Sequence, residues 1–431
     1  MGIKKLLQFL RDRNDKVVQT IQLKEIAGYR IAIDLPIICY QKKSEAICKL
    51  AKKLDLVYEE IDYSHAAFYM YKEVLHKAKI ILEAGCVPVF VFDGVAPLLK
   101  HKTKEMRSNK SNKKKDRITN LKRILRGLLG DNNQQYGKDG KPNKEHDPNT
   151  IKSNYEFTEY DLEFLQSLRG KKNRPISTIE DLKKILYTET TQFVMITPED
   201  YAILGAIFTS IGVPHVFAES EAEQTCAQMC CRKDVMAVYT TDSDCLAYGC
   251  PIMINKITQG TGVRIKSPTT ADCYTFTNVR EILQLTHQQI IDFCIMSGTD
   301  FNPNPPGYGP VAILELIQHY GSIKNIKQHH EYLKSRPLAD LHQMSKVERL
   351  CLNIDLEVLN YDEVIKIFTK TVTYQKESLE IKTDPEKFEK GLRLVKHLVG
   401  DINYRNIEES ARRVNELLIK IAPEVKHSKE N

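Results

Sequence analysis

Residues 218–246 read AESEAEQTCAQMCCRKDVMAVYTTDSDCL and contain two pairs of acidic residues. Glu221 and Glu223 form the first pair, and Asp242 and Asp244 form the second. A helix-length segment and a short apolar run separate the two pairs. Close carboxylates at the ends of buried elements are costly unless a cation neutralises their charge. This stretch therefore predicts a metal site, and the rest of the chain is interpreted by asking which residues converge on it.

Three further acidic residues stand at comparable places along the chain. Asp34 ends an apolar run, Asp93 follows the apolar strand predicted at residues 87–92, and Asp300 follows a helix predicted at residues 287–297. Because ligands bind at the carboxyl edge of a parallel sheet, we expect all seven carboxylates in one cleft. Oxygen ligands in that number suit Mg²⁺, with Mn²⁺ as a substitute. Two such ions about 4 Å apart can clamp a phosphodiester and activate water.

Each acidic residue also has a simpler interpretation. Ser220 and Glu223 have the spacing of a capping box, which is a serious local competitor to a metal ligand. Glu221 fits an ordinary acidic residue in a first helical turn. Asp93 before Gly94 is a common turn dipeptide. Only the joint occurrence of the seven residues at successive element ends favours the metal site.

The alternation of apolar strands and helices predicts an α/β fold with a central, mostly parallel sheet flanked by helices. Strands are expected at residues 29–33 and 87–92 and a helix between them at residues 63–83. Thr197 followed by Pro198 predicts the start of another helix. Beyond a Pro- and Gly-rich turn after Asp300, the pattern is mostly helical.

Composition and charge indicate a globular protein with one strongly basic segment. The chain has 431 residues, 42% hydrophobic and 28% charged, and a net charge of +7. Residues 100–126 hold twelve Lys or Arg against two acidic residues, so the remainder is slightly acidic. Charge alone leaves two interpretations open for this segment, a polyanion-binding surface or a solvated loop. No apolar run is long enough for a membrane span, and no membrane association is expected.

These residues together resemble the flap endonuclease branch of the XPG-like family of structure-specific 5′-nucleases. The resemblance rests on several segments that occur in the same order: MGIKKLLQFL (1–10), RIAIDLPIICYQ (30–41), VFDGVAPLLKHKTKEMR (91–107), AESEAEQTCA (218–227), TTDSDCLAYG (240–249), FCIMSGTDFN (293–302) and GYGPVAILELI (307–317).

The resemblance implies a PIN/XPG-like nuclease domain that uses two Mg²⁺ ions to hydrolyse DNA at 5′ flaps and single-strand/duplex junctions. Asp93, Glu221 and Glu223 would hold one ion, with Asp34 acting through water. Asp242, Asp244 and Asp300 would hold the other. The remaining site residues fall into two sets: Lys100 and Arg107 would steer the scissile phosphate, and Gly2, Tyr40, Lys113, Lys114, Lys115, Gly307 and Gly309 would contact DNA.

Four consecutive regions are expected from this comparison. Residues 1–107 and 191–325 would form the nuclease domain, the latter with a helix–hairpin–helix. Residues 108–190 would form a helical arch with a basic, partly disordered insertion, and residues 326–431 a helical C-terminal region. The long arch would fit a divergent viral homologue.

The sequence also departs from the family pattern. Val311 stands where the family usually has Lys. The C-terminal PEVKHSKEN lacks the family's clamp-binding motif, so recruitment to a sliding clamp by that route is not expected. We expect a monomer that acts in the nucleus, or at a host replication site if the protein is viral.

Other functions remain open at this stage. Within the family, the chain could be mainly a 5′–3′ exonuclease or could cut bubbles or Holliday junctions. A non-catalytic DNA-junction binder is a rival from another class, but it would gain nothing from acidic residues facing phosphates. An acid-rich phosphatase for small substrates would not need the basic segment.

Overall fold

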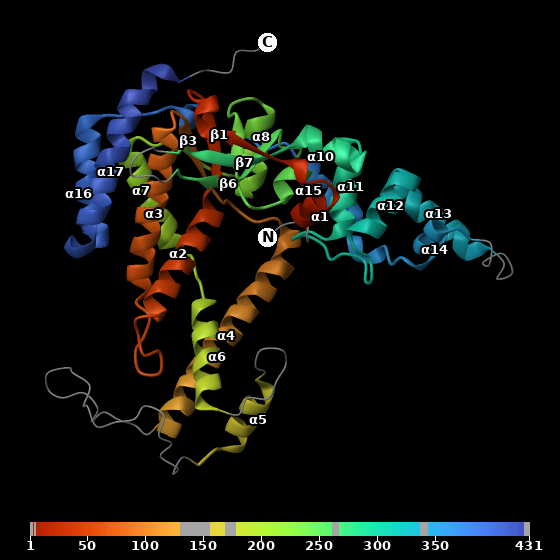
Figure 1. Cartoon of the computed structure of the whole chain (residues 1–431), viewed down its shortest axis with the longest axis horizontal. Helices are drawn as coiled ribbons and strands as arrows, with labels where there is room; N and C mark the ends of the chain where they lie inside the picture. Colours follow the sequence, from red (N-terminus) through yellow and green to blue (C-terminus); the bar gives the residue numbers. More distant parts are fainter. Residues whose placement is uncertain are drawn as a thin grey trace. The chain divides into compact units, whose positions relative to one another are not determined.

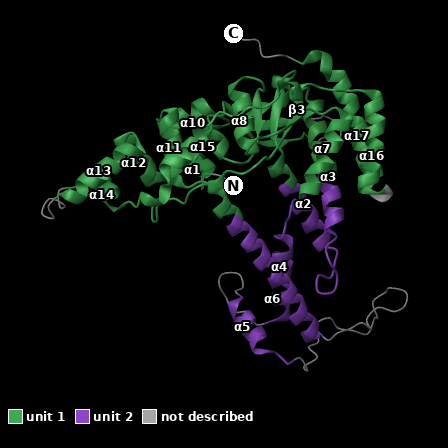
Figure 2. Ribbon diagram, turned by 180° about the vertical axis from the view of Figure 1, so that it is seen from behind, with its two compact units in different colours: residues 1–39, 71–104, 197–431 green, residues 40–70, 105–196 purple. Residues whose placement is uncertain are grey.

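The structure of the chain is a computed structural model that describes residues 3, 6–129, 156–168, 178–260, 267–336 and 344–425, without the side chains of 401–403. The chain forms two compact units, which are described separately here (Figure 2). Unit 1 comprises residues 1–39, 71–104 and 197–431, and unit 2 comprises residues 40–70 and 105–196. Within the described ranges, every helix is too short or too polar to cross a bilayer.

Unit 1 is built on a seven-stranded sheet in the order β1-β7-β6-β5-β2-β3-β4 (Figure 1). The strands are β1 (Val18–Gln22), β2 (Arg30–Asp34), β3 (Val87–Phe92), β4 (His215–Phe217), β5 (Ala237–Tyr239), β6 (Ile252–Thr258) and β7 (Thr270–Thr275). All pairings from β6 through β4 are parallel, and only β7 pairs antiparallel, with β1 and with β6. The predicted α/β class with a mostly parallel sheet is confirmed.

The centre of this sheet is covered on both faces, which explains the continuous apolar run of β3. Every residue of β3 is buried. The Phe90 ring stacks on Phe208 of α7 at a centroid distance of 4.5 Å, and Phe92 stacks on Phe217 at 4.5 Å. On the other face, α8 packs against β2, β3 and β5. A strand buried on both faces cannot alternate polar and apolar residues.

The helices of unit 1 begin and end at the signals that the sequence contains. Thr197 caps α7 by accepting from the N–H of Asp200, and Pro198 occupies the first turn. Gly212 ends α7 with φ of 78°, a conformation that glycine adopts without strain. The helices wholly within unit 1 are α1 (Leu6–Arg13), α7 (Pro198–Ile211), α8 (Ala222–Cys231), α9 (Asp244–Ala247), α10 (Phe276–Leu283), α11 (His287–Ser297), α12 (Pro310–Tyr320), α13 (Ile323–Ser335), α14 (Lys346–Asn353), α15 (Tyr361–Thr369), α16 (Pro385–Val399) and α17 (Asp401–Ile421).

Two groups of helices extend unit 1 on either side of its sheet. The helices α16 and α17 pack together and against α7, as Figure 1 shows. The helices α11 to α15 form a second group, in which α11 contacts α9, α12 and α15. Asp292 on α11 ties this group together, because it accepts from the N–H of Ile323 and from the hydroxyl of Tyr361.

Unit 2 is helical and has its own apolar core. It contains α5 (Glu159–Ser167) and α6 (Ile179–Thr191) and parts of α2 (Leu35–Ala51), α3 (Tyr63–Glu83) and α4 (His101–Leu129). Leu121 and Leu125 of α4 are buried with Leu182 and Leu186 of α6. The basic segment is therefore amphipathic at its C-terminal end.

Candidate metal centre

Three of the predicted ligands meet at the carboxyl edge of the sheet in unit 1. Asp93 follows β3, and Glu221 and Glu223 stand at the start of α8. One carboxylate oxygen from each of the three lies within 4.8 Å of the others. Glu221 and Glu223 are 4% and 6% exposed, whereas Asp93 is exposed at the rim. A divalent cation with several waters fits such an all-oxygen set.

The capping box expected from Ser220 and Glu223 is not formed, so that interpretation is wrong. Helix α8 begins at Ala222, and its N-cap residue, Glu221, makes no side-chain cap. The cap comes from Asp93, whose Oδ1 accepts from the N–H of Ala222 at 2.9 Å. This close approach needs Gly94, since a Cβ there would lie 2.0 Å from the carbonyl oxygen of Ala218. The side chain of Glu223 is thus left for another role.

The second predicted set lies around the end of β5. Asp242 and Asp244 are 7% and 1% exposed, and the N–H of Asp244 donates to Oδ1 of Asp242 at 3.0 Å. Asp300 follows α11, and its backbone oxygen accepts from the Thr103 hydroxyl at 2.7 Å. Among the described residues, the mutual proximity found for the first three ligands is not found for these three. Burial is the main cause that raises the pKa of Asp242 and Asp244, and the charge of nearby Asp300 adds to it.

Asp34 lies at the end of β2 and is linked to Asp242 of the second set through Thr240. Its Oδ2 accepts from the Thr240 hydroxyl at 2.7 Å, and that hydroxyl accepts from the N–H of Asp242 at 3.0 Å. Burial, and then the charge of Asp93, raises the pKa of Asp34 to about 8. This carboxyl is therefore protonated at neutral pH unless a cation is nearby.

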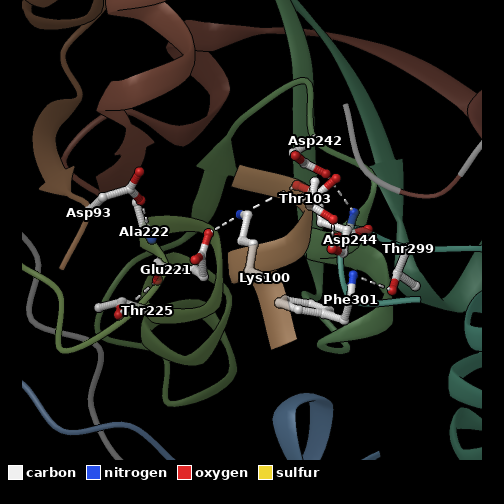
Figure 3. Close-up of polar contacts among 11 residues, drawn as sticks. Asp93, Lys100, Thr103, Glu221, Ala222, Thr225, Asp242, Asp244, Thr299 and Phe301 are labelled. Atoms are coloured by element: carbon white, nitrogen blue, oxygen red, sulfur yellow. Dashed lines mark hydrogen bonds and ion pairs between the residues drawn. The ribbon is translucent and has the colours of Figure 1, made fainter. Parts of the chain in front are cut away.

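Lys100 lies between the two sets of carboxylates (Figure 3). Its Nζ donates to Oε2 of Glu221 and lies 3.4 Å from Oδ2 of Asp300. Burial acts to lower the pKa of Lys100, but the charges of Glu223 and Glu221 outweigh it and raise that pKa above its ordinary value. The ammonium group is therefore the internal counter-charge of the cluster.

If all the carboxyls of this site were ionised, they would carry more negative charge than Lys100 can neutralise. Burial raises the pKa of Glu223, Asp242 and Asp244, for Glu223 and Asp244 well above the ordinary range. A cation that binds here must displace protons from these carboxyls. The electrostatics thus favour occupation by positive charge beyond that of Lys100.

The other predicted site residues are distributed over both units. Gly2 lies outside the described residues. Tyr40, 45% exposed on α2, belongs to unit 2, as does Arg107 on α4. Their part in the site stays a prediction.

The predicted DNA contacts on α4 and in the hairpin are also located. Lys113 and Lys115 are exposed on α4, whereas Lys114 donates to Oε1 of Gln192 at 2.9 Å. In unit 1, Gly307 has φ of 81° in the turn before α12, and a Cβ on Gly307 or Gly309 would meet open space. The turn backbone is thus accessible to a large ligand.

Two residues of the site were missed from the sequence. Thr240 links Asp34 to Asp242, and Thr103 holds Asp300. A signal for Thr240 exists, since a hydroxyl directly after a strand and two residues before an acidic residue can cap the turn. Thr103 stands three residues after Lys100, which places it one helical turn away.

Two family models match the chain over the regions that contain this site. The XPG N-terminal domain matches residues 1–114, and the XPG I-region matches residues 212–300. The first covers Asp34, Asp93 and Lys100, and the second covers the acidic residues from Glu221 to Asp300.

Curated relatives and solved structures agree with the family models. The probable RAD2-like endonuclease 369L of Invertebrate iridescent virus 6 is 28% identical over 331 residues, 76% of this chain and 73% of that protein. The flap endonuclease 1 of Enterocytozoon bieneusi is 27% identical over 326 residues, 76% of this chain and 72% of that protein. The catalytic core of Rad2 in complex with DNA substrate superposes with a TM-score of 0.57 at 16% identity, covering 97% and 100% of the chains, which shows a common fold.

An acidic site at the carboxyl edge of this sheet, matched by both XPG models, defines a nuclease of the XPG class. The chain contains the N-terminal domain and the I-region of the XPG family, and its similarity to flap endonuclease 1 and to the RAD2-like endonuclease supports a place in the flap endonuclease branch of that family.

Proposed function

We propose that this protein is a two-metal endonuclease that cuts DNA where a 5′ single-stranded flap joins duplex. The observation that carries the proposal is the cluster of exposed Asp93 with buried Glu221 and Glu223, with their oxygens within 4.8 Å of one another. Such a cluster in a member of the XPG family is suited to hard divalent cations, of which Mg²⁺ is the one proposed. The names of its relatives, flap endonuclease and RAD2-like endonuclease, support DNA flaps as the substrate class.

The residues divide into two sets of ligands. Asp93, Glu221 and Glu223 would hold one cation, with Asp34 acting through water, and Asp242, Asp244 and Asp300 would hold the other. The all-oxygen donor set and the excess negative charge of these carboxyls fit this role. When bound, the cations lower the pKa of an attacking water and offset charge on the phosphate.

Lys100 has a separate task in this proposal. In the structure its ammonium group neutralises Glu221 and Asp300. Once these carboxylates act as metal ligands, the ammonium group is available for a phosphate oxygen at the same place, where it stabilises developing charge. Arg107 would assist from α4, and Tyr40, Lys113, Lys114, Lys115, Gly307 and Gly309 would contact DNA.

The proposal extends to partners and location. The protein would act as a monomer on DNA in the nucleus, or at a cytoplasmic replication site if it is viral, without a sliding clamp bound at its C-terminal residues. Gel filtration with light scattering tests the monomeric state. A pull-down with clamp protein tests the absence of clamp binding.

A panel of substrates tests the central activity. Purified protein is incubated with 5′-flap, nicked, bubble and four-way-junction DNA and with a small phosphate ester, each with Mg²⁺ or with EDTA. We expect cleavage of the flap substrate close to the junction, in Mg²⁺ only, at a higher rate than any other substrate. Preference for a bubble or a four-way junction would reassign the specificity, and DNA binding without cleavage of any substrate would overturn the enzymatic proposal.

A further inference from the structure

Tyr248 stands one helical turn after Asp244, a member of the second set of carboxylates. It follows α9, and its N–H donates to the carbonyl oxygen of Asp244 at 3.1 Å. Side chains on a helix lean toward its N-terminus, so residue i+4 reaches back over residue i. The Tyr248 ring packs against Phe368 of α15 at a centroid distance of 5.0 Å, which fixes its plane.

The hydroxyl of Tyr248 is buried without a hydrogen-bond partner among the described residues. Tyr248 is only 6% exposed. A buried donor left unpaired costs about 1–3 kcal/mol. A functional role of the hydroxyl would offset this cost. Phenylalanine would fill the same space without this cost.

One acceptor near Tyr248 is also unpaired. Oδ1 of Asp244 is buried and has no partner among the residues that the structure describes. After burial, the charges of Glu223 and Asp244, one from each set, do most to raise the pKa of Tyr248, so both carboxyls lie near its hydroxyl. Helix α8, which carries Glu223, packs against α9. An orphaned donor and an orphaned acceptor thus occupy one buried region.

We propose that Tyr248 is a positioning residue for the metal centre. Its hydroxyl donates, through one buried water molecule, to Oδ1 of Asp244 and holds this carboxylate in the orientation in which it binds a divalent cation. The inference rests on the proposed metal-dependent function and adds to it a residue outside the seven carboxylates. Donors behind a ligating carboxylate fix its rotamer and tune the affinity of the site.

The chain provides a matched control for the test. Tyr274 on β7 is 1% exposed, and its hydroxyl is also buried without a partner within the described part of the chain. Its pKa is raised by burial and by Asp272, not by the acidic residues of the site. Tyr248→Phe and Tyr274→Phe therefore remove the same group from the same kind of environment, and only the first lies at the metal centre.

The experiment is a calorimetric titration of Mn²⁺ into the DNA-free protein. We expect Tyr248→Phe to weaken one class of site about 10-fold, the size of effect seen for outer-shell partners of metal ligands. Tyr274→Phe should bind Mn²⁺ as the wild type does. In flap cleavage, the Mg²⁺ concentration for half-maximal rate should rise by the same factor in Tyr248→Phe, with KM for DNA unchanged. In an Asp244→Asn background, Tyr248→Phe should have no further effect on Mn²⁺ binding.

Each other outcome contradicts the inference. Wild-type Mn²⁺ affinity in a folded Tyr248→Phe protein, checked by urea unfolding in EDTA, would overturn it. An equal loss of affinity in both variants would assign the effect to general core packing and would also overturn it. A wild-type protein that binds no Mn²⁺ would instead overturn the proposed function, and the wild-type titration therefore separates the two failures.

Discussion

At the scale of the single residue, Lys100 supplies the positive charge that offsets the carboxylates of the site. It is 8% exposed and bridges Glu221 and Asp300, which belong to different sets of carboxylates. A buried charge that loses its partner is strongly destabilising. When the site is loaded, metal ions would supply part of the positive charge that Lys100 alone supplies in the metal-free protein.

The effect of Lys100→Met on the free energy of unfolding should therefore depend on whether metal is bound. In EDTA we expect the free energy of unfolding to fall by about 3 kcal/mol, because Glu221 and Asp300 lose their counter-charge. With saturating Mg²⁺ the loss should be smaller, while the cleavage rate falls about 100-fold. Urea unfolding with and without Mg²⁺, and single-turnover cleavage, measure these effects. Lys102→Met, at an exposed position, is the control, and an equal loss of stability in both buffers would refute the counter-charge role.

The raised pKa of Asp34 predicts that the stability of the metal-free protein depends on pH. Its pKa is raised from 3.8 to about 8 in the folded state, so between these values the folded protein binds more protons than the unfolded chain. The contribution of Asp34 to stability is full below pH 4 and is lost as the pH rises toward 8, with a slope of at most about 1.4 kcal/mol per pH unit. Asp34→Asn should flatten this decline. Urea unfolding in EDTA at several pH values tests it, and an identical pH profile in wild type and variant would count against it.

The sequence predicted which acidic residues lie at the sheet edge, but not how they are held. The reason is that their hydrogen bonds join distant parts of the chain. Thr240 and Asp34 are 206 residues apart, and Asp93 and Ala222 are 129 apart. The local capping box at Ser220 and Glu223 was a plausible pattern, and a carboxylate from another strand replaced it. The spacing of neighbouring residues cannot predict a helix cap that comes from a distant part of the chain.

At the scale of the element, α4 combines two surfaces. Its C-terminal part packs through Leu121 and Leu125, while Lys113 and Lys115 are exposed. Arg117 pairs with Glu189, and Lys114 contacts Gln192, both at the end of α6. Of the three neighbouring lysines, the two outer ones are thus the more exposed, and the DNA contact predicted for all three stays a prediction.

Neutralising Lys113 and Lys115 should weaken DNA binding without unfolding the protein. With two phosphate contacts removed, the slope of log Kd against log salt should become less steep by about 1.8 for duplex. Fluorescence anisotropy at several salt concentrations measures the slope, with Lys366→Gln and Lys420→Gln as a control of equal charge. A slope equal to that of the wild type would mean that these lysines are exposed to solvent and do not contact phosphates.

Element boundaries were predictable where strong signals exist. Thr197 and Pro198 start α7 as expected, and α11 covers the predicted helix at residues 287–297. The antiparallel strands β1 and β7 were not predicted, because their sequences, VQTIQ and TADCYT, mix polar and apolar residues. Their burial is partial, so composition gives little signal for them.

At the scale of the whole molecule, the chain forms two units whose segments interleave in sequence. Residues 40–70 and 105–196 form one, and the rest forms the other. Three of the four boundaries fall inside α2, α3 and α4, and only the fourth lies in the connection between α6 and α7. Composition shifts, on which sequence-based domain division depends, cannot reveal such boundaries.

The C-terminal helices are an integral part of unit 1. Gly391 on α16 lies against α7, and a Cβ there would be 2.0 Å from Oγ and 3.0 Å from Cα of Ser210. Gly391→Ala should therefore lower the free energy of unfolding by about 1–3 kcal/mol through overpacking. Urea unfolding compares it with Lys390→Ala, an exposed neighbour. A stability equal to that of the control would indicate that α16 is not docked as described.

The most direct test of the central claim is single-turnover cleavage of a 5′-flap substrate by the wild type and by Asp244→Asn, with DNA binding measured in parallel. The claim is that the buried acidic cluster is a divalent-cation site that cuts DNA. We predict Mg²⁺-dependent cutting near the flap junction by the wild type, and no detectable cutting by Asp244→Asn despite unchanged DNA binding. Robust cutting by Asp244→Asn, or cutting by the wild type in EDTA, would contradict the account.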